Sequence, residues 1–290
     1  MRRGPEPSRC RAPRATVVLA LWALGCGGSG DRLTLDDCIR RHTAPAEESL
    51  LPTCVWTDRG ALVTESTYVA GVVDCELGGV RGAPAALEAQ AIAARTYLAR
   101  HLARQGDDAL VRTSPRFQCW RPSARPHAVA AAEATRDVVM HRGGSLITAN
   151  YVAGARALRA DCTPASPEAN GYDAASWDAM RRAYQDARAH RRRVPFSGAA
   201  WTEVVVTRNA GRWGEDVLPT PMGRAGPANR GAMGQNAAVC LALKGHDADA
   251  ILRYFYGDDV DVFRPMHPAL EDLRVPADDL PEASPRETSR

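Results

Sequence analysis

Residues 84–104 read PAALEAQAIAARTYLARHLAR, and this alanine-rich stretch decides the fold around it. Pro84 suits the first turn of a helix, where no backbone N–H is needed, and no glycine or proline follows it within the stretch. The sequence therefore predicts a long helix whose apolar stripe packs into the core. Gln90, Arg95 and Tyr97 lie off that stripe, whose members recur at helical spacing: Leu87, Ala91, Ala94, Leu98 and Leu102.

The segments on either side of this helix indicate strands. Residues 61–73 are apolar enough for a buried strand, or for a strand that runs into a helix. The Gly78-Gly79 pair that follows breaks this segment. Downstream, residues 137–141 and 145–152 flank the pair Gly143-Gly144, which is typical of a hairpin. We therefore expect an α+β fold: one mixed domain with an antiparallel sheet around this hairpin, flanked by the Pro84 helix and by closing helices.

The rest of the chain completes this prediction. A short helical pattern occupies residues 128–134. A charged helical pattern occupies residues 174–193, and we interpret this second one as part of a surface insertion. Residues 202–208 predict a further strand, and the glycine- and proline-rich residues 211–234 predict an irregular surface segment. Two helices should follow, at residues 235–244 and 247–257, the second capped by Asp247, before a disordered tail at residues 263–290.

Charge excludes one class of partner. The chain has 290 residues, 45% of them hydrophobic, which is enough for one main core. Its 37 basic and 34 acidic residues nearly cancel, to a net charge of +3. The one short basic run, Arg191 to Arg193, has no interleaved aromatic residues, so we do not expect a nucleic-acid partner.

The amino terminus predicts export. Arginines precede an apolar run at residues 15–24, which is too short for a permanent membrane span and suits a signal peptide over residues 1–25. The run ends at Ala23-Leu24-Gly25-Cys26, which resembles a bacterial lipobox. We expect lipidation at Cys26 and a lipid-anchored protein of the periplasm or cell envelope, with plain secretion as the alternative. Residues 26–60 would then form a tether and a small cysteine-containing appendage.

Six cysteines remain after the predicted signal peptide and lipid site, and an even number in an oxidising compartment favours disulfides. We predict that Cys38 pairs with Cys54, and we leave the other pairings open. A zinc site is the rival interpretation, but the chain has no CxxC pair or close His/Cys cluster. We therefore expect no metal and no other cofactor.

Glu76 is the residue that draws attention by its surroundings. A glutamate before two glycines is ordinarily a solvated turn residue. Here the apolar Val72 and Val73 precede it, so partial burial should raise the pKa of the carboxyl and let it donate a proton near neutral pH. The following glycines would let a bulky substrate come close.

An ordered series of motifs makes a family resemblance specific. Residues 68–76 read YVAGVVDCE and residues 85–97 read AALEAQAIAARTY. Phe117-Gln118-Cys119, then Ala134-Thr135-Arg136, then Met233-Gly234-Gln235 follow, and residues 251–256 close the series with ILRYFY. In this order, over residues 61–262, the chain resembles the stage II sporulation protein D, or amidase-enhancer, family.

The resemblance implies binding of peptidoglycan glycan strands and, in active members, lytic transglycosylation with Glu76 as the catalytic acid. It implies substrate recognition by Gln90, Arg95, Tyr97, Gln118 and Gln235. From the residues alone, an ion pair of Arg95 with Glu88 is the favoured interpretation, and the glutamines could equally cap helices or make buried hydrogen bonds. The family's usual histidine before the Met-x-Gln motif is replaced here by Asn229, which we count as a candidate substrate contact.

Three hypotheses follow. The chain is a peptidoglycan lytic transglycosylase, or a non-enzymatic module that binds peptidoglycan and stimulates a cell-wall amidase, or a structural envelope lipoprotein that uses the inherited fold only for contacts. The second is kept open by Asn229. The direction of the Glu76 side chain separates the third from the others, because a working site needs Glu76 beside the glutamines.

Overall fold

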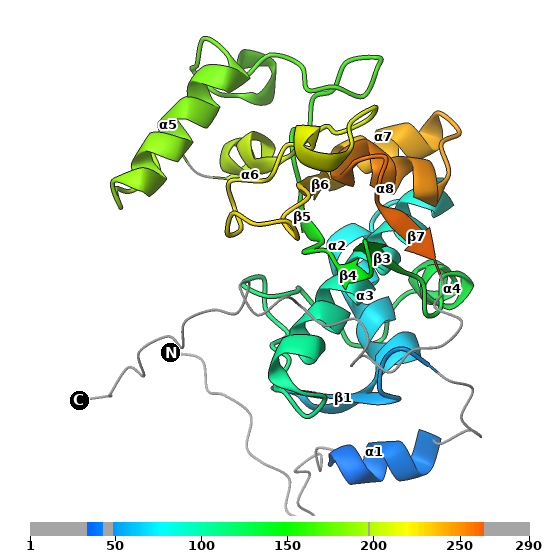
Figure 1. Ribbon diagram of the computed structural model, residues 1–290. Helices are drawn as coiled ribbons and strands as arrows, with labels where there is room; N and C mark the ends of the chain where they lie inside the picture. The colour runs from blue at the N-terminus through cyan, green and yellow to red at the C-terminus, as the bar shows by residue number, and fades with distance from the viewer. Residues whose placement is uncertain (1–33, 43–48, 197, 264–290) are drawn as a thin grey trace, which may run out of the picture. The chain divides into compact units, whose positions relative to one another are not determined.

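The computed structural model describes residues 34–42, 49–196 and 198–263 (Figure 1). The predicted signal peptide, the lipidation site Cys26 and the tail from residue 264 lie outside the described residues. The described chain is a mixed α+β fold, as predicted, with small sheets flanked by helices. No helix among these residues is long and apolar enough to cross a membrane.

The long helix predicted from residues 84–104 is α3, Pro84–Gln105, with Pro84 in its first turn and Gly106 ending it at a φ of 98°. The predicted stripe is buried: Leu87, Leu98 and Leu102 join one core cluster, which also contains residues of α2, Ala70–Leu77, and α4, Pro126–Ala134. A second face of α3, including Ile92, joins another cluster with α7, Gln235–Leu243, and α8, Ala248–Tyr256. The small alanines let α3 pack closely on two sides. A search for one apolar stripe therefore underestimates how much of the helix surface is buried.

The apolar residues 61–73 are a strand running into a helix. Strand β1, Cys54–Thr57, pairs antiparallel with β2, Gly60–Val63; a π-helical segment, η1, Thr64–Val69, then leads directly into α2. Because α2 is helical, residues two apart point in different directions. Asp74 and Glu76 therefore face different neighbours: Asp74 is paired with Arg125 at 2.6 Å.

The glycine hairpin is confirmed, but its second strand is shorter than predicted. Strand β3, Val139–Arg142, pairs antiparallel with β4, Ser145–Leu146, across Gly143 and Gly144, which have φ values of 54° and 78°. Strand β7, Asp261–Phe263, adds to the other edge of β3. The rest of the predicted second strand separates as β5, Asn150–Val152, which pairs in parallel with β6, Ala232–Gly234.

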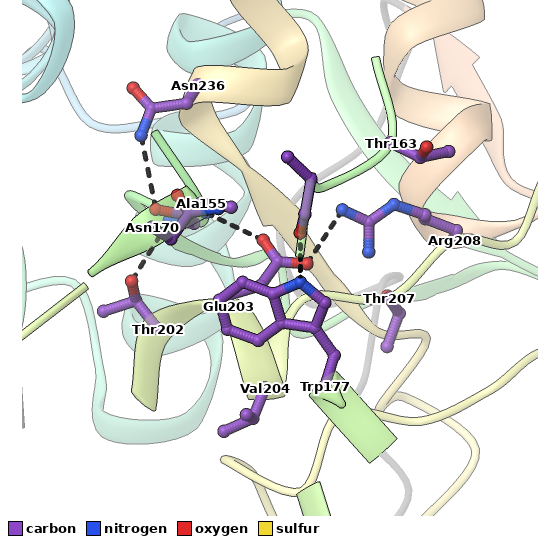
Figure 2. A network of polar contacts seen from close by, with 12 residues as sticks. Ala155, Thr163, Asn170, Trp177, Thr202, Glu203, Val204, Thr207, Arg208 and Asn236 are labelled. Carbon is purple, nitrogen blue, oxygen red and sulfur yellow. Dashed lines mark hydrogen bonds and ion pairs between the residues drawn. The ribbon is translucent and has the colours of Figure 1, made fainter. Parts of the chain in front are cut away.

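The predicted strand at residues 202–208 is wrong. Helix α6, Ala199–Val205, covers most of that range, and the chain becomes extended only from Val206. Figure 2 shows the reason: Glu203 turns inward, accepts a hydrogen bond from the Ala155 N–H at 2.8 Å and pairs with Arg208 at 2.9 Å. This buried tertiary network outweighs the strand preference of the neighbouring valines.

The remaining elements agree more closely. The charged helix is α5, Trp177–Ala189, shorter than the predicted 174–193, and α1, Leu35–His42, lies in the appendage. Residues 211–234 are irregular apart from β6 and a short 3-10 helix, η3, Gly214–Asp216; another, η2, spans Glu168–Asn170. As predicted, Asp247 caps α8, its side chain accepting from the Ala250 N–H at 2.8 Å.

Three disulfides cross-link the described chain. The predicted Cys38–Cys54 pair is confirmed and joins α1 to β1. Cys162 pairs with Cys240, which ties the segment after β5 to α7. Cys75 pairs with Cys119 and so attaches α2 to the loop that follows α3. Within the described ranges, no group of three or more His, Cys, Asp or Glu residues has the geometry to hold a metal ion.

Candidate functional site

Glu76 lies in the last turn of α2 with a partly buried side chain. Its Oε1 accepts a hydrogen bond from the Cys119 backbone N–H at 3.2 Å, and its Oε2 accepts one from Gln235 Nε2 at 3.0 Å. Burial raises the pKa of the Glu76 carboxyl above its ordinary value, and the two hydrogen bonds offset only part of that rise. The direction is the one predicted from the sequence, and it suits a group that must donate a proton.

Two glutamines extend this contact into a chain of amides. Gln235 is the first residue of α7, and its Nε2 also donates to Gln90 Oε1 on α3 at 3.1 Å. Gln90 is fully buried, and its Nε2 has no hydrogen-bond partner among the described residues. A buried amide without a partner is costly, so this N–H₂ group is an unsatisfied donor next to the residue that binds Glu76.

Gln118 and two tyrosines form the neighbouring part of the site. Gln118 Oε1 accepts from the Tyr68 hydroxyl at 2.7 Å, and Gln118 Nε2 donates to the Tyr151 hydroxyl at 2.9 Å and to the Ala94 carbonyl at 3.1 Å. Gln118 precedes Cys119, whose N–H holds Glu76. The structure therefore brings Gln90, Gln118 and Gln235 together around Glu76, from α3, the loop after it, and α7.

Tyr151 is a member that sequence reasoning missed. It lies on β5, and its pKa is raised well above the ordinary value by burial first and then by the nearby negative charge of Glu76. The phenol therefore remains protonated and can act as a hydrogen-bond donor. Its place depends on the parallel pairing of Tyr151 with Met233, two residues before Gln235, and no local pattern announces that pairing.

Close packing fixes the loop that carries Cys119. Besides the Cys75–Cys119 disulfide, Trp120 Nε1 donates to the Thr67 carbonyl at 3.0 Å. A Cβ atom on Gly71 would lie 2.2 Å from Trp120 Nε1 and 2.7 Å from the Arg121 carbonyl, so only glycine permits this approach. The N–H that binds Glu76 is thus held by a covalent link, a hydrogen bond and a steric fit.

Arg95 does not face the Glu76 cluster. Its side chain is fully buried, and its guanidinium makes a two-pronged ion pair with Glu65, with both N–O distances 2.7 Å. It also donates to the carbonyls of Ala132 and Val138. The predicted pairing with Glu88 is wrong because Arg95 points inward, toward α4 and the start of β3, where these partners lie.

Tyr97 and Asn229 also lie apart from Glu76. Tyr97 packs edge-on against Phe117, with ring centroids 5.1 Å apart, and lines a separate cavity. The Asn229 amide is buried and is used up in its own loop: it accepts from the Thr220 N–H at 3.0 Å and donates to the carbonyls of Thr220 and Arg224. Asn229 shapes the loop after η3 and has no contact with Glu76.

Fold and site together define an α+β protein with one partly buried carboxyl set among amide and phenol donors. Residues 61–141 match the family model described as SpoIID, stage II sporulation protein, which supports assigning this segment to that family. It spans β2 to β3 and contains Glu76, Gln90 and Gln118, whereas Gln235 and Tyr151 lie beyond it. No curated protein matches the chain in sequence. The family is consistent with a function related to the cell wall.

Proposed function

We propose that the chain cleaves peptidoglycan glycan strands as a lytic transglycosylase, with Glu76 as both acid and base. The observation that carries the proposal is the state of Glu76: its pKa is raised by burial, and its hydrogen-bonding neighbours are an amide and a backbone N–H. Asp74, the nearest acid in sequence, is engaged with Arg125. A site built on one carboxyl suits a reaction that needs no second carboxylate.

The reaction proceeds in two proton transfers. Protonated Glu76 gives its proton to the oxygen that links N-acetylmuramic acid to the next sugar, and the bond from the anomeric carbon to that oxygen breaks. The 6-hydroxyl of the same muramoyl residue then attacks the anomeric carbon and closes a 1,6-anhydro ring. Its proton passes to the Glu76 carboxylate, which restores the acid, and no water is consumed. Ordinary glycosidases need a second carboxylate for this half of the reaction.

The neighbouring donors have distinct tasks in this scheme. Gln235 and the Cys119 N–H hold the two oxygens of Glu76 and stabilise the carboxylate formed after the first transfer. Gln90 Oε1 accepts from Gln235 Nε2 at 3.1 Å and so positions the amide that binds Glu76. Gln118 orients the Tyr151 hydroxyl through a 2.9 Å hydrogen bond.

A second candidate is a non-enzymatic module that binds peptidoglycan and stimulates a cell-wall amidase. Asn229 favours it, because the family usually has a histidine at this place and here the amide is consumed by loop contacts. In either case the proposed setting is the periplasm or cell envelope, with a lipid anchor at Cys26 and glycan strands as the ligand.

Mass spectrometry of purified glycan strands tests the proposal. Strands are incubated with the wild-type chain, with Glu76→Gln, and with Glu168→Gln, which changes an exposed glutamate of η2 as a matched control. Anhydro-muramoyl ends should appear with the wild type and with the control, and Glu76→Gln should reduce them at least ~100-fold, the usual contribution of a general acid. If no protein releases ends while all of them bind strands, the amidase-stimulating function replaces the enzymatic one.

A further inference from the structure

A cavity of about 380 Å³ lies beside the C-terminal half of α3. Tyr97, His101 and Arg104 line it from α3, and Phe117 and Arg224 line it from the two loops nearby. A smaller cavity of about 100 Å³ shares Arg104 and Arg224 with it. Together these two spaces, which we call the basic cavity, have three arginines in their lining and no aspartate or glutamate.

Two of the three arginines that line the basic cavity lack a carboxylate partner in the described part of the chain. Among the described residues, Arg104 and Arg224 have no carboxylate partner, and the buried Nε of Arg104 makes no hydrogen bond there. The buried Nε2 of His101 is likewise without a partner in the described part of the chain. Guanidinium groups without a carboxylate partner in one concave space are suited to an anion.

The basic cavity is aligned with the Glu76 cluster by a single helix face. Gln90, Tyr97, His101 and Arg104 follow one another on α3 at spacings of seven, four and three residues, which return to the same side of the helix. At a rise of 1.5 Å per residue, Tyr97 lies about 10 Å along the axis from Gln90, and Arg104 about 21 Å. The loop after α3 also connects the two sites, because Phe117 lines the basic cavity and the next residue, Gln118, joins the Glu76 cluster.

The chemistry of the lining selects among anions. A guanidinium presents a planar fork that matches a carboxylate. The edge-on ring pairs of Phe117 with Tyr97 and with His101, at 5.1 and 4.8 Å between centroids, provide an apolar wall beside the charges. A ligand that carries a carboxylate on an aliphatic or sugar framework fits both features.

We infer that the basic cavity binds a carboxylate carried by the glycan strand, about two to four turns of α3 away from Gln90 and the Glu76 cluster. The inference rests on the proposed function and adds a recognition site to it. Glycan strands offer two sources of this group: the carboxylates of the peptide stems, and the lactyl carboxylate that is freed where a stem has been removed.

Isothermal titration of the full chain with defined fragments tests this inference. The ligands are a disaccharide with its peptide stem, the stem-free disaccharide with its lactyl carboxylate, and both compounds with their carboxylates converted to methylamides. The variants are Arg104→Gln and the more exposed Arg224→Gln. Arg112→Gln is the matched control, because Arg112 is exposed and lines neither part of the basic cavity. Circular dichroism melting confirms that each variant folds.

Each cavity variant should weaken binding of a carboxylate-bearing fragment about 10-fold, the effect of losing one charge-assisted hydrogen bond, while the control stays within about 2-fold. Amidation of the ligand should cause a similar loss. Whether the stem-bearing or the stem-free fragment is the affected one identifies the source of the carboxylate. Unchanged binding by both variants, or undiminished binding of amidated ligands, overturns the inference and leaves the proposed function standing. Failure of the wild type to bind any fragment counts against both.

Discussion

At the scale of single residues, Glu76 experiences opposing influences on its pKa. Burial favours the neutral acid, whereas the donors Gln235 and Cys119 favour the carboxylate. Since the net shift is upward, the protonated acid persists to higher pH than a solvated glutamate would allow. The same donors bind the carboxylate more strongly than the neutral acid, so they stabilise the product of the first proton transfer. They also lower the pKa of Glu76, which reduces the fraction of the protonated acid.

This balance predicts the pH dependence of Gln235→Leu. The acid must be protonated for the first transfer, so activity is full below the pKa of Glu76 and falls as pH rises through it. Removing the 3.0 Å donor removes an interaction that lowers this pKa, and the alkaline limb should therefore move to higher pH. Rates of anhydro-end formation against pH measure the shift. Gln185→Leu, at an exposed position on α5, should leave the limb in place, and a limb that moved downward would contradict the assigned contact.

At the scale of elements, the site depends on how the loop after α3 is attached to α2. The Cys75–Cys119 disulfide joins the residue before Glu76 to the residue whose N–H binds Glu76, so it fixes both ends of one hydrogen bond. Cys162–Cys240 joins the segment after β5 to α7, and neither of its cysteines donates to Glu76. Removing each bridge in turn can therefore distinguish an effect on stability from an effect on catalysis.

Replacing each disulfide by paired serines should show this difference. Their sequence separations of 44 and 78 residues predict similar losses of unfolding free energy, ~4 and ~4.5 kcal/mol from chain entropy alone. Only Cys75→Ser/Cys119→Ser should also lower the rate of strand cleavage below what its folded fraction explains. Urea unfolding gives the stabilities and anhydro-end release gives the rates, at a temperature where both variants are folded. Equal losses of activity per folded molecule would mean that the loop attachment has no catalytic role.

At the scale of the whole molecule, local and long-range features differ in how well the sequence reveals them. Helix α3 follows from Pro84 and an uninterrupted alanine-rich run, and the β3–β4 hairpin follows from Gly143-Gly144, because each depends on neighbours in sequence. The parallel pair β5–β6 joins residues about 80 positions apart, and the site depends on it for Tyr151. Motif order indicated that Gln90, Gln118 and Gln235 belong with Glu76, but it could not reveal that Arg95 turns into the core.

Arg95 shows what such a buried group does for the molecule. One guanidinium joins Glu65 of η1 to the carbonyls of Ala132 in α4 and Val138 before β3, so three elements meet at one side chain of α3. The arrangement is fully buried, and water cannot replace a lost partner. Removing the guanidinium leaves the carboxylate of Glu65 and two carbonyls without their donors, whereas removing both charged groups leaves only the carbonyls.

Stability measurements on Arg95 and Glu65 should therefore be non-additive. Arg95→Leu should lower the free energy of unfolding by ~3–5 kcal/mol, and the double variant Glu65→Leu/Arg95→Leu should be less destabilised than the sum of the single changes. Urea denaturation of the four proteins closes this double-mutant cycle. Fragment binding by folded Arg95→Leu, measured below its melting temperature, should match the wild type, because the side chain is fully buried and does not reach the Glu76 cluster. A loss of binding without a loss of stability would instead make Arg95 a ligand contact. Additive changes in the free energy of unfolding would show that the Arg95–Glu65 pair does not join η1, α3 and α4.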